Sequence, residues 1–400
     1  MSPTAVALCL FALTLAVGWH PHLGRTSGGI ARGISWFAVS AAASGLLLLP
    51  AAVRAGQVWF VAVELVVAIW VVVLGIFAAR WRAIDALLRR QRLVTTVLLL
   101  LETCWLASAV LLLQQLADGS DRILLAGGAL VVAAAVAWRR AFVVAGPSTL
   151  TAVSLLALAL TVFAARFLRP EAYRVVAVDG DMEPLIVVAL LLLGLARETV
   201  GLASRYLTID TGQTEHVRMA AWTHAVLRIV LIGTLYTVGS VQVATAEGAT
   251  GSGLQATLAA FAGFGPASSV ALFALAALLV LALASWVWAL SSAGMSIIRR
   301  EQAIVRGSGV LLIVMAAAFA TTRFVALRPV WAEAVDLVYG ATMGWVAVRR
   351  AHPLPTGWLV AVVAAALLRP WTASWLPLAG LAVLSGVVAA VTVPGRRAES

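Results

Sequence analysis

Six ionisable residues stand inside long apolar stretches of this sequence. In chain order they are Glu64, Glu102, Arg197, Glu198, His224 and Arg228. An ionised side chain in a hydrocarbon environment costs at least ~2.5–3.5 kcal/mol, so such residues usually face a protein interior or a water-filled cavity. Two interpretations stay open: an ion or ligand pathway, or interhelical ion pairs that only fix the packing. Asp336 is a further candidate, but it lies near a predicted helix end, where solvation explains it.

The spacing of these residues predicts some of their partners. His224 lies one helical turn before Arg228, so the two share a helix face. Arg197 and Glu198 are adjacent and diverge around the helix, so they cannot easily neutralise each other. We therefore expect Arg197 or Arg228 to pair with Glu102 or Glu64 from another helix. A buried carboxylate that lacks such a partner could carry a proton.

Five arginines form the densest basic patch, between two apolar stretches. They are Arg80, Arg82, Arg89, Arg90 and Arg92. The mostly apolar residues 83–88 separate them, a pattern typical of an amphipathic helix at the membrane interface. The patch either only determines topology or also docks anionic lipid headgroups or an acidic cytoplasmic partner protein.

Other site chemistry finds little support. His20 and His22 flank a proline and form no helical pair that would bind a metal, so neither a metal site nor a cofactor is expected. Hydrolase, metalloprotease and nucleotide-binding motifs are absent, which argues against an enzyme without excluding one. The net charge of +11 would suit a nucleic-acid binder, but only 11% of the residues are charged. Nucleic acid is therefore not an expected partner.

Composition gives the class of protein. Of the 400 residues 62% are hydrophobic, and the mean hydropathy is +1.02. Soluble domains carry roughly 45–50% apolar and about 25% charged residues. The sequence therefore predicts an all-α polytopic membrane protein, with membrane lipids as its surroundings. Runs of ~20 apolar residues, enough to cross a bilayer, predict about thirteen transmembrane helices at 4–19, 33–52, 57–79, 93–116, 123–138, 149–167, 184–204, 221–243, 267–293, 308–327, 331–347, 355–369 and 376–393.

Arginines orient these helices. Most of them, Arg205 and Arg218 included, fall in connectors that follow odd-numbered helices. Because basic residues are retained in the cytoplasm during insertion, this bias predicts the N-terminus outside and the C-terminus inside. The chain has no lysine and no asparagine, which is typical of a GC-rich bacterial genome. The expected location is thus the bacterial cytoplasmic (inner) membrane.

Paired arginines indicate an internal repeat. Arg89–Arg90 and Arg139–Arg140 have the same spacing as Arg299–Arg300 and Arg349–Arg350. We therefore expect a parallel 6+6 repeat: residues 1–170 hold the first six helices and 184–370 the second six, joined by an outer acidic loop at 171–183. Residues 371–400 then hold one extra C-terminal helix and a short basic tail.

Two functions remain. The first is a transporter or flippase, whose polar pathway would use the intramembrane carboxylates and arginines. The alternative is a non-transporting membrane subunit, a sensor or scaffold, that docks a partner on cytoplasmic arginine-rich loops. Neither the solute nor the role of the glycine-rich segment 244–266 follows from the sequence.

Overall fold

A computed structural model gives the fold. The residues it describes are 28–43, 49–114, 121–138, 145–168, 170, 173, 184–208, 213–241, 261, 268–298, 307–318, 338–340 and 342–343. The predictions for the first span, with His20 and His22, for Asp336, for most of 244–266 and for the last two spans lie outside these residues. So do the arginine pairs at 139–140, 299–300 and 349–350, so the repeat stays a prediction.

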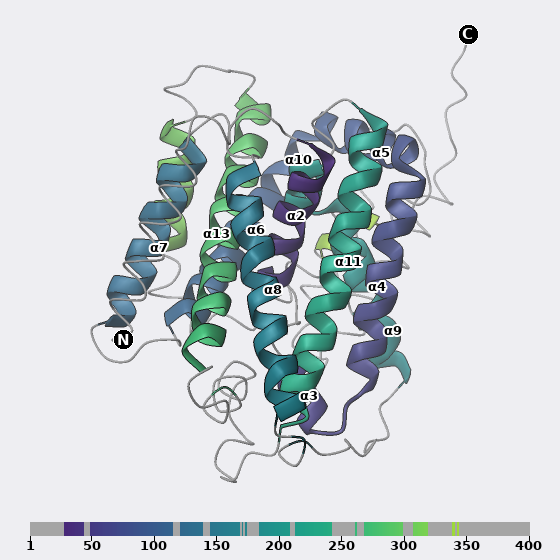
Figure 1. Cartoon of the computed structure of the whole chain (residues 1–400). Helices are drawn as coiled ribbons and strands as arrows, with labels where there is room; N and C mark the ends of the chain where they lie inside the picture. The colour runs from purple at the N-terminus through teal and green to yellow at the C-terminus, as the bar shows by residue number, and fades with distance from the viewer. Residues whose placement is uncertain are drawn as a thin grey trace, which may run out of the picture.

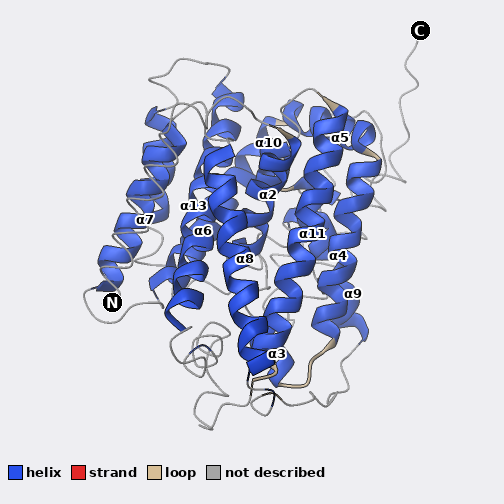
Figure 2. Ribbon diagram, viewed as in Figure 1, coloured by secondary structure: helices blue, strands red, loops and turns tan. Residues whose placement is uncertain are grey.

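The described part of the chain is helical (Figure 2). Among the described residues, β-type backbone pairing is limited to an isolated antiparallel bridge between Tyr173 and Val241. The named helices are α2 (Gly29–Ala43), α3 (Leu49–Arg54), α4 (Trp59–Ile76), α5 (Ala78–Arg90), α6 (Arg92–Gln114), α7 (Asp121–Trp138), α8 (Ala145–Leu168), α9 (Pro184–Val200), α10 (Leu202–Thr208), α11 (Thr214–Gly239) and α13 (Ser268–Ile298).

The long helices run side by side in one bundle, with α2 in its interior (Figure 1). On one flank α11 packs against α2 and α4, and α4 packs against α9. On the other flank α13 packs against α2, α6, α7 and α8. Close approach of α2 and α11 depends on Gly33, because a Cβ there would collide with the backbone of Ala220. The core therefore lies around α2.

Apolar side chains also cover the outside of the bundle. Ile69, Leu100, Val131 and Leu160 are each at least 60% exposed, although they sit in the middle of helices. A water-soluble protein rarely exposes so many large apolar side chains. Five described helices are long and apolar enough to cross a bilayer: Trp59–Ile76, Arg92–Leu111, Thr149–Leu168, Thr214–Gly239 and Ser268–Ile298. The chain is a multi-pass helical membrane protein, as predicted.

One predicted span is not a continuous helix, because 184–204 is interrupted at Gly201 between α9 and α10. Hydropathy missed this interruption because it measures polarity and not backbone continuity. The described parts of the span 33–52 belong to α2 and α3. The prediction of 221–243 also placed the start of α11 too late, because the polar first turns from Thr214 are helical too.

The helix order places α5, α10, the first turn of α11 and the end of α13 at one end of the bundle (Figure 1). Each of these segments adjoins a connector that is rich in arginine, and the arginine distribution predicts that these connectors lie on one face of the membrane. The common location of the segments agrees with that prediction. Which face is cytoplasmic stays a prediction.

Candidate functional site

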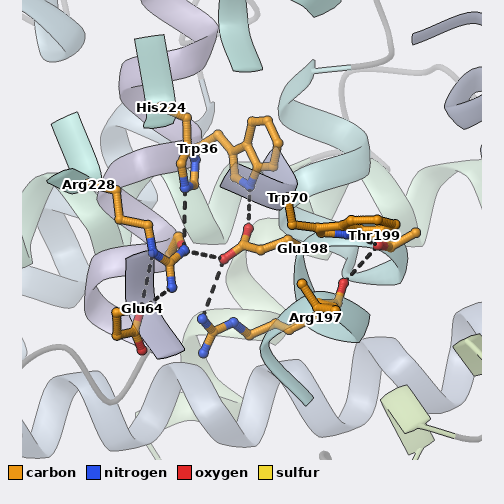
Figure 3. Close-up of polar contacts among 10 residues, drawn as sticks. Trp36, Glu64, Trp70, Arg197, Glu198, Thr199, His224 and Arg228 are labelled. Atoms are coloured by element: carbon orange, nitrogen blue, oxygen red, sulfur yellow. Dashed lines mark hydrogen bonds and ion pairs between the residues drawn. The ribbon is translucent and has the colours of Figure 1, made fainter. Parts of the chain in front are cut away.

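Arg228 is the centre of a buried ion cluster. Its guanidinium is fully buried and contacts two carboxylates, Glu64 from α4 and Glu198 from α9 (Figure 3). Its Nε lies 3.1 Å from Glu64 Oε2, and its Nη1 lies 2.7 Å from Glu198 Oε1. The predicted pairing of Arg228 with Glu64 is confirmed. Arg197, Arg228, Glu64, Glu198 and His224 are called the central ion cluster below.

Glu198 accepts hydrogen bonds from three helices. Trp36 Nε1 of α2 donates to its Oε2 over 2.9 Å, and Ser40 Oγ of the same helix donates to Oε1 over 2.5 Å. Arg197 also reaches Oε1, at 3.4 Å. The prediction that Arg197 and Glu198 cannot easily neutralise each other is therefore wrong, because the long arginine side chain bends back toward its neighbour. Glu198 thus ties α9 to α2 and α11.

His224 lies beside Arg228, as its position one turn earlier predicts. Its Nε2 is 3.5 Å from Arg228 Nη1. A guanidinium can only donate, so this contact uses Nε2 as its acceptor. The imidazole ring packs at a tilt against Trp36, with 4.3 Å between the ring centroids. His224 therefore adds packing surface beside Arg228.

The interruption at Gly201 exposes backbone groups next to this cluster, and side chains satisfy them. Trp81 Nε1 donates to the Thr199 carbonyl over 2.8 Å, and the Leu202 N–H donates to Glu102 Oε1 over 2.6 Å. Glycine is required at the interruption, because a Cβ on Gly201 would lie 2.5 Å from the Arg197 carbonyl oxygen. The helix break is thus built into the sequence.

Glu102 of α6 is fully buried in the bundle and has no arginine partner among the described residues. Besides Leu202, its donors are Tyr339 Oη at 2.7 Å, Trp286 Nε1 at 3.4 Å and the Ala203 N–H. The expected pairing of Glu102 with Arg197 or Arg228 is therefore wrong. Its described partners are two backbone amides and two aromatic side chains.

A cavity of about 20 Å³ lies between these groups. That volume is enough for roughly one water molecule. Glu102, Arg197 and Glu198 reach it from two helices, and α2, the α9–α10 break and α13 supply the rest of the wall. Its lining residues are Trp36, Val39, Ser40, Glu102, Arg197, Glu198, Gly201, Ala203, Ser204, Trp286 and Tyr339.

A second ion cluster lies at the end of the bundle where α5 meets α10. Asp85 Oδ1 is 2.8 Å from Arg205 Nε, and Asp85 Oδ2 is 2.7 Å from Arg89 Nε. The guanidinium carbon of Arg89 also lies 4.2 Å from the centre of the Tyr206 ring. Arg205 is fully buried, so the prediction that it is a connector arginine is wrong. Sequence reasoning missed this pair because a single Asp in an arginine-rich segment looks solvated.

The five arginines of the predicted docking patch divide into two groups. Arg82 donates to Thr214 Oγ1, and Arg89 pairs with Asp85, so both are engaged within the protein. Arg80, Arg90 and Arg92 are exposed, and these three are called the exposed arginine patch below. The segment is the amphipathic helix that the sequence predicts. Docking itself stays a prediction.

No protein-family model and no curated protein sequence matches the chain. Among solved structures it is similar to a Na+-coupled sialic acid symporter in a substrate-bound, outward-open state. The TM-score is 0.70 at 13% sequence identity, and the match covers 96% of this chain and 95% of that one. At this identity the similarity establishes the fold. The chain therefore has the fold of that membrane symporter over almost its whole length.

Proposed function

We propose that this protein is a secondary transporter that exposes the cavity at the α9–α10 break alternately to the two sides of the membrane. The observation that carries the proposal is the position of the central ion cluster. The cluster lies directly beside an interrupted helix, and two of its members, Arg197 and Glu198, line a cavity inside the bundle. Transporter sites are typically built where discontinuous helices meet near the middle of the bilayer.

Two further observations support a transporter that changes conformation. The fold is that of a symporter over 96% of the chain, which makes transport the first function to test. The ion cluster also joins four separate helices, α2, α4, α9 and α11, through hydrogen bonds that can exchange partners. A polar network of this kind can have two arrangements, which alternating access requires.

The membrane, the orientation and the pathway residues of this proposal come from the sequence. We place the protein in the bacterial inner membrane, with the α5–α10 end of the bundle on the cytoplasmic face. Glu64, Glu198, Arg197, Arg228 and His224 form the polar part of the pathway, and Glu102 closes the cavity from α6. Sialic acid is the solute named for the similar symporter. It is the first solute to test here, with and without a Na+ gradient.

Alternating access can be tested without knowing the solute. Ser204→Cys places a thiol in the cavity wall, in a background in which Cys9 and Cys104 are replaced. We expect a membrane-impermeant thiol reagent to label this cysteine from either face of oriented proteoliposomes. Conditions that favour labelling from one face should suppress it from the other.

The matched control is Ser291→Cys, a buried hydroxyl position on α13 that does not line the cavity. It should stay unlabelled from both faces. If Ser204→Cys is also unlabelled from both faces under every ionic condition, the protein does not alternate. The non-transporting subunit is then the better interpretation.

A further inference from the structure

Glu102 is an unbalanced negative charge next to the cavity. In the central ion cluster the carboxylates of Glu64 and Glu198 are balanced by the guanidiniums of Arg197 and Arg228. Glu102 adds a third carboxylate to this region, and its described partners are neutral donors. A buried charge without a counter-ion is costly, and the usual remedy is to bind a cation or a proton.

The two oxygens of Glu102 are not equivalent. Oε1 accepts two short hydrogen bonds, from the Leu202 N–H at 2.6 Å and from Tyr339 Oη at 2.7 Å. Oε2 lies 3.4 Å from Trp286 Nε1, and the Ala203 N–H is a further donor to the carboxylate. A proton on Oε2 therefore leaves both bonds to Oε1 in place. The cavity next to this carboxylate has room for the water that would deliver the proton.

The other elements packed on α6 bring few charges toward Glu102. From α9, Arg197 and Glu198 line the same cavity, and Tyr339 is the titratable group on the segment 338–340. The described cavity-lining residues of α2, α10 and α13 are uncharged. On α5, Asp85 pairs with Arg89 of the same helix and with Arg205 of α10. The described buried residues of α7 are apolar.

We propose that Glu102 is a proton-binding site that couples protonation to movement of the α9–α10 break. This inference rests on the proposed transport function and names its coupling ion. In the ionised state Oε1 holds the first amide of α10 and Tyr339 through charge-assisted hydrogen bonds. These are roughly twice as strong as hydrogen bonds between neutral groups. Protonation of Oε2 removes the charge, weakens both bonds and releases α10 to move.

The first test is infrared spectroscopy of the full-length protein in lipid, titrated from alkaline to acidic pH. We expect the carbonyl band of a protonated carboxylic acid to appear on acidification and to be missing in Glu102→Gln. The matched control is Glu215→Gln, which alters an exposed carboxylate at the start of α11. This variant should keep the band. Persistence of the whole band in Glu102→Gln would overturn the proposal.

The second test links the proton to the movement. Labelling of Ser204→Cys is expressed relative to an exposed cysteine at the same pH, because only the thiolate reacts. This relative labelling should rise about tenfold as the pH falls through the transition, which corresponds to about 1.4 kcal/mol. With Glu102→Gln the relative labelling should stay at the acidic level at every pH. Because that variant can also misfold, Tyr339→Phe serves as the second variant. It removes one donor to the ionised carboxylate, so its transition should move to higher pH.

The two proposals fail in different ways. If Ser204→Cys alternates between faces with the same pH profile in Glu102→Gln and in the parent protein, transport stands and the proton site is wrong. An unshifted transition in Tyr339→Phe likewise contradicts the proton site. If Ser204→Cys never alternates, the transport proposal itself fails.

Discussion

Removing the arginine at the centre of the ion cluster should be among the most damaging single changes in the protein. Arg228→Met leaves Glu64 and Glu198 buried without their shared cation. Removing one partner of a buried ion pair costs about 3–5 kcal/mol. Because both carboxylates depend on Arg228 and its side chain is fully buried, we expect a loss of at least this size. Folded proteins are stable by only about 5–15 kcal/mol, so the variant keeps a small part of its stability.

The same reasoning predicts a rescue. Glu64→Gln and Glu198→Gln, added to Arg228→Met, remove the orphaned charges and should recover most of the loss. Buried ion pairs can be replaced by neutral residues of similar size at little cost when both partners are removed together. Arg197 keeps its charge in this variant, and its side chain is partly exposed. The measurement is the free energy of unfolding in mixed micelles for the parent protein, the single variant and the triple variant. The differences give the coupling energy between Arg228 and the two carboxylates. The reasoning is refuted if the triple variant is no more stable than Arg228→Met alone.

Helix packing and the charges at the α5–α10 end of the bundle give three more testable outcomes. Gly33→Ala should lower the free energy of unfolding by about 1–3 kcal/mol, because its Cβ meets the α11 backbone. Gly127→Ala is the control: its Cβ meets nothing within 4 Å, so the change should be neutral or slightly stabilising. Arg205→Met should cost about 1–3 kcal/mol in the same assay, since it removes the buried partner of Asp85 and leaves that aspartate with Arg89 alone. Arg90→Met at the exposed surface should stay within about 0.5 kcal/mol. Replacing the exposed arginine patch by glutamine should reduce the number of anionic lipids retained in native mass spectrometry. Unchanged retention would contradict lipid docking on this patch.

The helical membrane class could be predicted from the sequence because hydropathy alone determines it. The apolar runs at 57–79, 93–116 and 267–293 correspond to α4, α6 and α13. The candidate residues were also visible, since an ionised side chain in an apolar run is conspicuous. The pairing of Arg228 with Glu64 follows from charge complementarity, although nothing in the sequence says that α4 and α11 are neighbours.

The rest of the site depends on tertiary contacts that leave no local pattern. Glu102 was expected to find an arginine, but α6 packs beside the helix break, so backbone amides and aromatic donors satisfy it instead. Trp36 and Trp81 look like ordinary apolar residues, yet their indole N–H groups hold Glu198 and the Thr199 carbonyl. One signal was available: Gly201 follows an Arg–Glu pair inside an apolar run, a place where a helix can break.

Alternating access requires that the helix bundle has two arrangements. A measurement of the distance between α5 and α13 tests this requirement most directly. Spin labels at Arg90→Cys and Ile298→Cys occupy exposed positions on α5 and α13 at the same end of the bundle. Pulsed electron resonance in lipid should give two distance populations whose ratio changes with pH or with Na+. A single distance under every condition would contradict alternating access.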